Sequence, residues 1–209
     1  MSKSTKTGWA QWHDESEPLR IGVSSCLLGE RVRFDGGHTR DRFVSDTLGK
    51  WVEWVPVCPE VELGMGVPRA TIHLERSDTG NRLIQPKTGV DFTERMNDFA
   101  DEKIRQLRDL GLDGYILKKG SPSCGMERMA VYSDGQRIHR RGVGLFASML
   151  MEQWCQLPIE EEGRLNDHGL RENFIERILC RNRWRLVRRA GLTRSLLVEF
   201  HTAHPIPRG

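Results

Sequence analysis

Three cysteines in the sequence stand where a short apolar run gives way to loop residues. Cys26 follows "RIGVS", Cys58 follows "WVEWVPV" and Cys124 follows "ILKKGSPS". None of the three has a second cysteine two to four residues away, which is the spacing that zinc ribbons and dithiol motifs use. Thiolates from three separate loops that converge are suited to a metal ion or an iron–sulfur cluster, which is one interpretation of this pattern.

Other interpretations of the cysteines stay open. A structural zinc site usually has four ligands, often two from one short loop, and no such pair or histidine partner is evident. Three unrelated buried thiols are possible because free cysteine is among the most buried residue types. A redox sensor would need a resolving cysteine nearby. Cys155 and Cys180 lie inside helical patterns, and we expect both to be packing residues.

Groups that could carry out acid–base chemistry lie beside these cysteines. Glu60 follows Cys58 by two positions with a proline between them, so its carboxylate could act as a general base on a water molecule. Alternatively, it is a surface carboxylate or an anchor for backbone amides. Ser121 and Ser123 precede Cys124, and either hydroxyl could bind a polar substrate atom or simply cap the local turn.

Further candidates for substrate binding come from two stretches rich in polar and glycine residues. The stretch "RFDGGH" supplies an acid, two glycines that permit close backbone approach, and an imidazole, at Asp35, Gly36, Gly37 and His38. Positive charge for an anionic group is available from Lys118, Lys119 and Arg69. Charged residues at loop ends are usually solvated, so a surface role is the alternative for each.

Strand-like runs before the cysteines alternate with helical patterns. Helices are predicted from Thr93 to about Gly111, over residues 142–156, and from about Leu170 to Arg189. This alternation predicts an α/β fold with a mostly parallel, Rossmann-like sheet, flanking helices and a helical C-terminal extension. Ligands of such sheets gather at the carboxyl ends of the strands, where all three cysteines would lie.

Composition sets limits on compartment and partners. The chain of 209 residues is 37% hydrophobic and 29% charged, which is typical of a globular protein. No apolar run approaches the roughly 20 residues that span a bilayer, so we expect no membrane partner. Residues 1–19 lack the apolar core of a signal peptide and are expected to be a flexible polar leader. Five cysteines, an odd number, suggest free thiols in a reducing cytoplasm.

Charge is unevenly distributed along the chain. The formal net charge is only +3, yet residues 177–209 contain eight arginines and one glutamate. This segment is the candidate for contact with a polyanion such as RNA, with Arg183, Arg185, Arg188 and Arg189 as the residues to test. The alternative is a helix whose polar face is merely rich in arginine.

Four segments together strongly resemble the TudS desulfidase family. They are "SSCLLGERVRFDGGH", "VPVCPEVELGMGVPR", "ILKKGSPSCGMERMAVY" and "GVGLFASML", and they occur in order within residues 20–165, the expected desulfidase domain. The resemblance implies non-redox removal of sulfur from thiolated uracils, giving a uracil-type product and hydrosulfide. It implies that Cys26, Cys58 and Cys124 ligate a [4Fe-4S] cluster and that Glu60 and Ser121 form the catalytic pair, with Ser123 the alternative hydroxyl.

Residues 166–209 resemble the start of a second domain that accompanies RudS-type enzymes, which act on 4-thiouridine in tRNA. We expect these residues to form an arginine-rich helical extension and a truncated second domain, since "HTAHPIPRG" does not continue the pattern. The expected substrates are therefore 4-thiouridine in tRNA, its nucleosides and free thiouracils. The competing hypothesis is a metal-stabilised RNA-binding module without catalytic activity.

Overall fold

A four-stranded parallel sheet forms the centre of the molecule. The computed structural model describes residues 18–78, 80–133 and 135–203. The strands are β1 (Leu19–Ser24), β2 (Val52–Val57), β6 (Gly114–Leu117) and β9 (Ile159–Glu161), in the spatial order β2-β1-β6-β9. All three strand pairs are parallel. The predicted α/β class with a parallel sheet and flanking helices is thereby confirmed.

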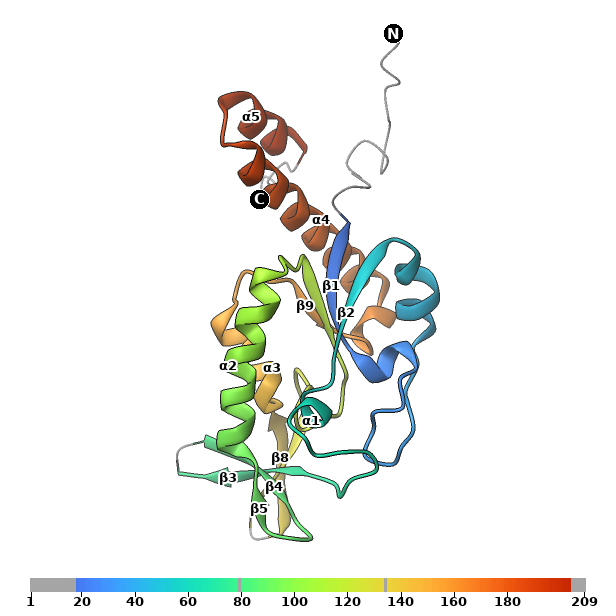
Figure 1. The fold of residues 1–209 in the computed structure, drawn as a ribbon, viewed down its shortest axis with the longest axis vertical. Coiled ribbons are helices and arrows are strands. Elements are labelled where there is room, and N and C mark those ends of the chain that lie inside the picture. Colours follow the sequence, from blue (N-terminus) through green and yellow to red (C-terminus); the bar gives the residue numbers. More distant parts are fainter. Residues whose placement is uncertain (1–17, 79, 134, 204–209) are drawn as a thin grey trace.

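Hydrophobic cores cover both faces of this sheet. Successive residues of β6 point to opposite faces, so Tyr115 packs in one cluster and Ile116 in the other. The first cluster lies under helices α2 (Thr93–Asp109) and α3 (Leu145–Gln153), and the second under α4 (His168–Ala190) (Figure 1). A sheet covered on both sides explains why all four residues of β6 are buried.

A second sheet, which the sequence pattern did not indicate, lies below the first in Figure 1. Its strands are β3 (His73–Ser77), β4 (Gly80–Gln85), β5 (Val90–Asp91), β7 (Met129–Ser133) and β8 (Gln136–Gly142), in the order β5-β4-β3-β7-β8. Only β3 and β7 pair in parallel. Several of these strands carry charged residues that face solvent, so they lack the continuous apolar run that marks a buried strand.

The main helices agree with the predicted ones, with shifted ends. Helix α3 is shorter than residues 142–156, because β8 extends to Gly142 at its start and residues 154–156 form a turn at its end. Helix α4 begins two residues before Leu170 because the Asp167 carboxylate accepts the Leu170 N–H at 2.9 Å and caps it. The short helices are η2 (Ser25–Leu28), η3 (Phe43–Thr47), η4 (Leu48–Lys50), α1 (Pro59–Glu62), η5 (Arg164–Asn166) and α5 (Arg194–Ala203). Among the described helices, none combines the length and apolarity that crossing a membrane requires.

The predicted boundaries of the leader and the extension stay predictions. Residues 1–17 and 204–209 lie outside the described part of the chain. Leu19, the last residue of the expected leader, is the first residue of β1. Helices α4 and α5 make up the extension, and α4 runs past the edge of the parallel sheet (Figure 1).

A fully buried carboxylate anchors α4 to the sheet. Asp113, just before β6, accepts the backbone N–H of Arg20 at 3.1 Å and the side-chain amide of Asn182 at 3.0 Å. Arg185 donates to both oxygens of the same carboxylate, at 3.1 and 3.2 Å. One acidic side chain thus holds β1, β6 and the third quarter of α4 together.

We expect Asp113→Ala to lower the free energy of unfolding by about 3 kcal/mol, because it removes the acceptor of a partly buried guanidinium and of a buried amide. Urea denaturation checks this result. The control is Glu53→Ala, which breaks the partly exposed Arg20–Glu53 ion pair and should cost less than about 1 kcal/mol. Equal losses from the two variants would contradict the anchoring role.

Candidate active site

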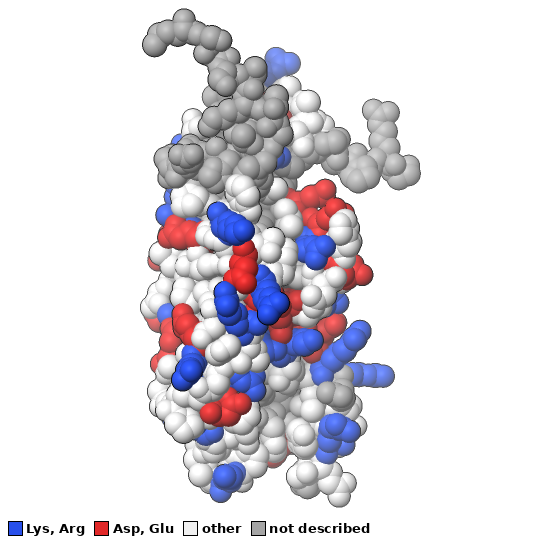
Figure 2. All heavy atoms as spheres, turned by 90° about the vertical axis from the view of Figure 1, so that its right-hand side faces the viewer, with Lys and Arg blue, Asp and Glu red and all other residues white. Residues whose placement is uncertain are grey.

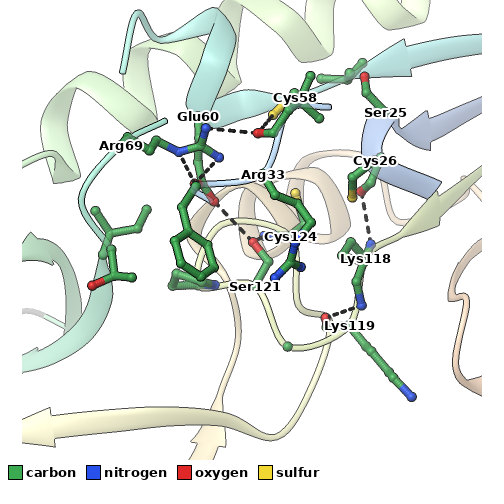
Figure 3. A pocket seen from close by; sticks show the side chains of 18 residues that line it. Ser25, Cys26, Arg33, Cys58, Glu60, Arg69, Lys118, Lys119, Ser121 and Cys124 are labelled. Atoms are coloured by element: carbon green, nitrogen blue, oxygen red, sulfur yellow. Dashed lines mark hydrogen bonds and ion pairs between the residues drawn. The ribbon is translucent and has the colours of Figure 1, made fainter. Parts of the chain in front are cut away.

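The three predicted cysteines line one cavity at the carboxyl ends of the parallel strands. The strand order reverses there, because the chain goes from β1 to β2 on one side and continues at β6 on the other. The loops after β1, β2 and β6 surround a cavity of about 240 Å³ that is lined by Cys26, Cys58 and Cys124. Figure 3 shows the cysteines approaching this cavity from different loops.

Each cysteine is held by the backbone of its loop. Cys26 lies in η2 directly after β1, and Cys58 is the residue before α1, with its N–H bonded to the Glu62 carboxylate at 3.0 Å. The Cys124 N–H donates to the Ser121 hydroxyl at 3.2 Å. Cys26 and Cys124 are buried, and Cys58 is half-buried. The backbone of the three loops therefore determines where the thiols lie.

The loop that carries Cys124 rests on the first turn of α3. The N–H groups of Leu145 and Ala147, which have no partner within the helix, donate to the carbonyls of Pro122 and Ser123 at 3.1 Å each. The packing is so close that a Cβ on Gly144 would lie 2.5 Å from the Ser123 carbonyl oxygen. This arrangement explains why "GVGLFASML" accompanies "SPSCG" in the sequence.

The cavity disfavours three negative charges unless a positive centre joins them. Burial raises the pKa of Cys26, raises that of Cys58 to about 11, and raises that of Cys124 well above its ordinary value. The thiolates also raise one another's pKa, because Cys26 acts on Cys58 and both act on Cys124. A bound metal centre would supply the compensating charge that thiolate ligands require.

The spacing of possible ligands does not suit a single zinc ion. Among the described residues, no three His, Cys, Asp or Glu side chains come together closely enough to hold one metal ion. Three sulfurs around one zinc would be about 3.8 Å apart, given Zn–S bonds of about 2.3 Å. An iron–sulfur cluster binds each thiolate at a different iron atom, so the ligating sulfurs can be farther apart than around one zinc ion.

One polar group beside the cysteines supports this fit. The Thr39 hydroxyl oxygen is buried without a hydrogen-bond partner of normal length in the described structure. It is nevertheless close enough to Cys26 to lower the pKa of that thiol, against the larger effect of burial. A donor in this position is available to the sulfur of a ligating thiolate, so the residues present fit a three-cysteine cluster.

Glu60 lies in the same cavity and is held from both sides. One carboxylate oxygen accepts from Arg69 Nε at 2.8 Å and lies 2.7 Å from Arg69 Nη2. The other oxygen accepts from the hydroxyls of Ser121 at 3.3 Å and Ser123 at 3.0 Å. The side chains of Glu60 and Arg69 are only 12% and 5% exposed, so each charge depends on the other.

The two serines differ in their access to the cavity. Ser121 lines it, and its hydroxyl oxygen also accepts the N–H groups of Ser123 and Cys124, both at 3.2 Å. Ser123 is completely buried and is not among the lining residues. The geometry therefore leaves Ser121 as the hydroxyl that can touch a ligand, while Ser123 orients the carboxylate.

Lys118 also lines the cavity and is fixed by a buried acid. Its ammonium group donates to the Glu162 carboxylate at 2.5 Å and to the Lys119 carbonyl at 2.8 Å. Glu162 accepts the Lys119 N–H as well, at 2.7 Å. The charge of Lys118 lowers the pKa of Cys26, in opposition to burial.

The "RFDGGH" loop contributes different residues from those predicted. Asp35, Gly36, Gly37 and His38 are not among the residues that line the cavity. Asp35 instead accepts the Gly37 N–H at 2.9 Å, and His38 accepts the Arg40 N–H at 3.2 Å, so both stabilise the turn. The residues of this loop that line the cavity are Arg33 and Phe34, which precede Asp35. Phe34 is 40% exposed. The feature of the sequence that could have identified it is an aromatic residue within a polar loop.

The structure separates the two remaining cysteines from the site. Cys155 is exposed in the turn after α3, because that helix ends at Gln153, so its prediction as a packing residue is wrong. Cys180 is partly buried in α4. All five cysteines are free thiols.

Comparison with known proteins identifies the family. The family described as "2-thiouracil desulfurase" matches residues 21–162. The chain belongs to the 2-thiouracil desulfurase family. It is 30% identical over 158 residues to the uncharacterized protein YbbK of Bacillus subtilis (strain 168), covering 70% of this chain and 98% of that protein.

A solved structure shows the same fold. The [4Fe-4S]-dependent thiouracil desulfidase TudS superposes with a TM-score of 0.58 at 28% identity, over 74% of this chain and 98% of that one. These findings confirm the resemblance that the four sequence segments indicated. Helices α4 and α5 begin after the matched residues 21–162, so they are additional to the family domain.

A double-mutant cycle tests the Glu60–Arg69 pair. We expect Arg69→Met to lower the free energy of unfolding by about 3 kcal/mol, because it leaves a buried carboxylate uncompensated. In Glu60→Gln/Arg69→Met the loss should be smaller than the sum of the single losses, by at least about 1.5 kcal/mol. Urea denaturation of all four proteins supplies these values, and additive losses would mean that the two charges do not depend on each other.

Proposed function

We propose that this protein hydrolytically removes sulfur from thiolated uracil rings, using a [4Fe-4S] cluster ligated by Cys26, Cys58 and Cys124. The single observation that carries the proposal is the placement of the Glu60 carboxylate, bridged to Ser121, in the cavity that the three cysteines line. Membership of the 2-thiouracil desulfurase family and the likeness to TudS support it.

The cofactor and the protein would divide the chemistry between them. A cluster with three cysteine ligands supplies an open, thiophilic iron that can accept the substrate sulfur. Lys118 places a positive charge beside Cys26, and Arg69 places another beside Glu60. These fixed charges offset the negative charge that thiolates and a carboxylate bring into one partly buried cavity.

Glu60 acts as the general base. Its Oε1 atom accepts a proton from water, and the water oxygen forms a bond with the ring carbon that carries sulfur. As this bond forms, one of the two bonds of the thiocarbonyl breaks and its electron pair moves to sulfur. The remaining carbon–sulfur bond then breaks with its electron pair on sulfur, the added oxygen becomes the new carbonyl, and its proton leaves with the sulfide together with the proton held by Glu60. Thiouracil and water thus give uracil and hydrogen sulfide, which ionises to hydrosulfide, and no electron donor or acceptor is consumed.

Ser121 and Phe34 would position the ring. The Ser121 hydroxyl is fixed by two backbone N–H donors and reaches both the cavity and Glu60, so it can hold the ring or the attacking water near the base. Phe34 lines the cavity while remaining 40% exposed. Its face is suited to stacking on a flat pyrimidine at the point where the cavity meets solvent.

The exposed position of Phe34 bears on the substrate. A base that enters beside it can keep a ribose outside the cavity, so we propose 4-thiouridine, free or within tRNA, together with free thiouracils, as substrates. We further propose that the protein works in the cytoplasm, because five free thiols suit a reducing compartment. The metal-stabilised RNA-binding module without activity is disfavoured, since such a site needs neither Glu60 nor Ser121.

Activity of anaerobically reconstituted protein tests this function. We expect hydrosulfide release from 4-thiouridine, a loss of at least about 100-fold in kcat for Glu60→Gln, and a smaller loss for Ser121→Ala. Iron content should stay near that of the wild type, because a glutamine oxygen can still accept from the two serines and, in Ser121→Ala, the Ser123 hydroxyl still donates to Glu60. The matched control is Glu94→Gln, which removes an exposed carboxylate of α2.

Two results would refute the proposed chemistry. One is the absence of hydrosulfide from any thiolated uracil in iron-loaded protein. The other is a Glu60→Gln variant that is as active as Glu94→Gln. The variant Ser123→Ala distinguishes the roles of the two hydroxyls. If it loses more kcat than Ser121→Ala does, the buried Ser123 is the serine that contacts the substrate.

A further inference from the structure

A second hollow, formed where α4 meets the family domain, is lined by arginine and tryptophan. It has a volume of about 500 Å³. We call it the basic groove; its principal lining residues are Arg108, Trp154, Arg181, Trp184, Arg188 and Arg189. Helix α2 and the turn after α3 supply one side, and the C-terminal half of α4 supplies the other.

Fixed guanidinium groups form the inner wall of the groove. Arg108 and Arg181 lie over the ring of Trp154, at 5.6 and 5.1 Å from its centroid. Arg181 also donates to the carbonyls of Leu112 at 2.9 Å and Gln156 at 3.3 Å, and Arg108 donates to a backbone carbonyl at the end of α3. Carbonyl acceptors orient these cations without neutralising them.

The groove therefore has an excess of positive charge. Among its described lining residues none is acidic. Asp113 lies beneath it but is fully buried and already accepts from Asn182 and Arg185. Arg188 and Arg189 are exposed on the last turn of α4. By contrast, acidic and basic side chains are interspersed over most of the face in Figure 2.

This combination fits a single-stranded nucleic acid. Arginines along a groove can bind successive phosphates of a strand, and aromatic side chains provide surfaces on which unpaired bases stack. Trp184 is 38% exposed, and Phe200 of α5 packs against it at 5.2 Å between centroids, which supports the indole from one side. A membrane surface is less suitable as a partner because the cations line a hollow instead of projecting from a flat face.

The position of the groove further restricts the ligand. Gly111, which lines it, precedes β6, whereas Lys118 and Ser121 of the active-site cavity follow β6. The two sites therefore lie at opposite ends of that strand. A free base or nucleoside in the cavity cannot touch the groove, but a polymer can reach both.

We propose that the basic groove binds a single-stranded stretch of an RNA whose thiolated uridine is presented to the active-site cavity. This inference rests on the proposed function for the identity of the presented base. Binding of the strand itself does not depend on that function. The groove would give a role to α4 and α5, which lie outside the residues matched by the family.

Fluorescence anisotropy of a labelled, unstructured 20-nucleotide RNA tests the binding. The iron-loaded full chain is titrated at several KCl concentrations, with and without one 4-thiouridine in the RNA. We expect Arg188→Gln/Arg189→Gln to weaken binding of both RNAs at least about tenfold. The slope of the logarithm of the binding constant against the logarithm of the KCl concentration should become less steep by about 1.4. Each arginine that neutralises one phosphate of a single strand accounts for about 0.7 of that slope.

The control, Arg76→Gln/Arg137→Gln, removes the same charge from exposed positions on β3 and β8. It should leave the affinity within about twofold. Equal weakening in both double variants, or none in the groove variant, would overturn the proposal. The proposal would also be overturned if the groove variant bound RNA as the wild type does but no longer bound anionic phosphatidylserine vesicles.

Turnover distinguishes failure of the groove from failure of the desulfidase. In the groove variant, kcat/KM for the 4-thiouridine-containing RNA should fall at least about tenfold, while kcat/KM for free 4-thiouridine stays unchanged. A parallel fall on both substrates would overturn the proposal. If neither substrate releases hydrosulfide in wild-type protein, the proposed chemistry fails, and the anisotropy result alone decides whether the groove binds RNA.

Discussion

The ion pair between Glu60 and Arg69 connects the loops on which the site depends. Arg69 donates to the Val32 and Gly66 carbonyls as well as to Glu60. Glu60 in turn accepts from the serines that precede Cys124. One buried pair thus ties the loops after β1, β2 and β6 into a single unit. Because both charges are almost fully buried, neither residue can be replaced without leaving the other charge in an unfavourable environment.

Catalytic and structural demands coincide in this arrangement. The carboxylate needs a cation for burial and hydroxyl donors for orientation, and the same interactions hold the cysteine loops around the cavity. The parallel sheet determines where the cavity lies, since ligand sites form where the strand order reverses, here between β1 and β6. Helix α3 then fixes the Cys124 loop through N–H groups that any helix leaves unpaired at its first turn.

The sequence revealed those parts of the molecule that rest on local pattern. Apolar strands before each cysteine and periodic helices predicted the parallel sheet, and the family segments predicted Glu60 and Ser121 beside the cysteines. The second sheet escaped prediction because its polar, partly exposed strands depend on pairing between distant segments.

Some side-chain positions could not be read from residue type. Asp35 and His38 looked like ligands, but local hydrogen bonds turn them into the loop and bring Phe34 to the cavity. Cys155 looked like a packing residue until the end of α3 placed it in an exposed turn. The sequence indicated Arg188 and Arg189 as polyanion contacts, but the basic groove itself could not be predicted, since Arg108 and Trp154 meet α4 only in the folded chain.

The proposed chemistry requires that Cys26, Cys58 and Cys124 hold one [4Fe-4S] cluster. Mössbauer spectroscopy with iron analysis, on protein reconstituted anaerobically with 57Fe and sulfide, tests it most directly. We expect about four irons per chain in a cubane. The cluster signal should be lost when any of the three cysteines is replaced by serine, and it should be retained in Cys155→Ser and Cys180→Ser. A wild-type protein without bound iron, or equal loss in Cys180→Ser, would contradict it.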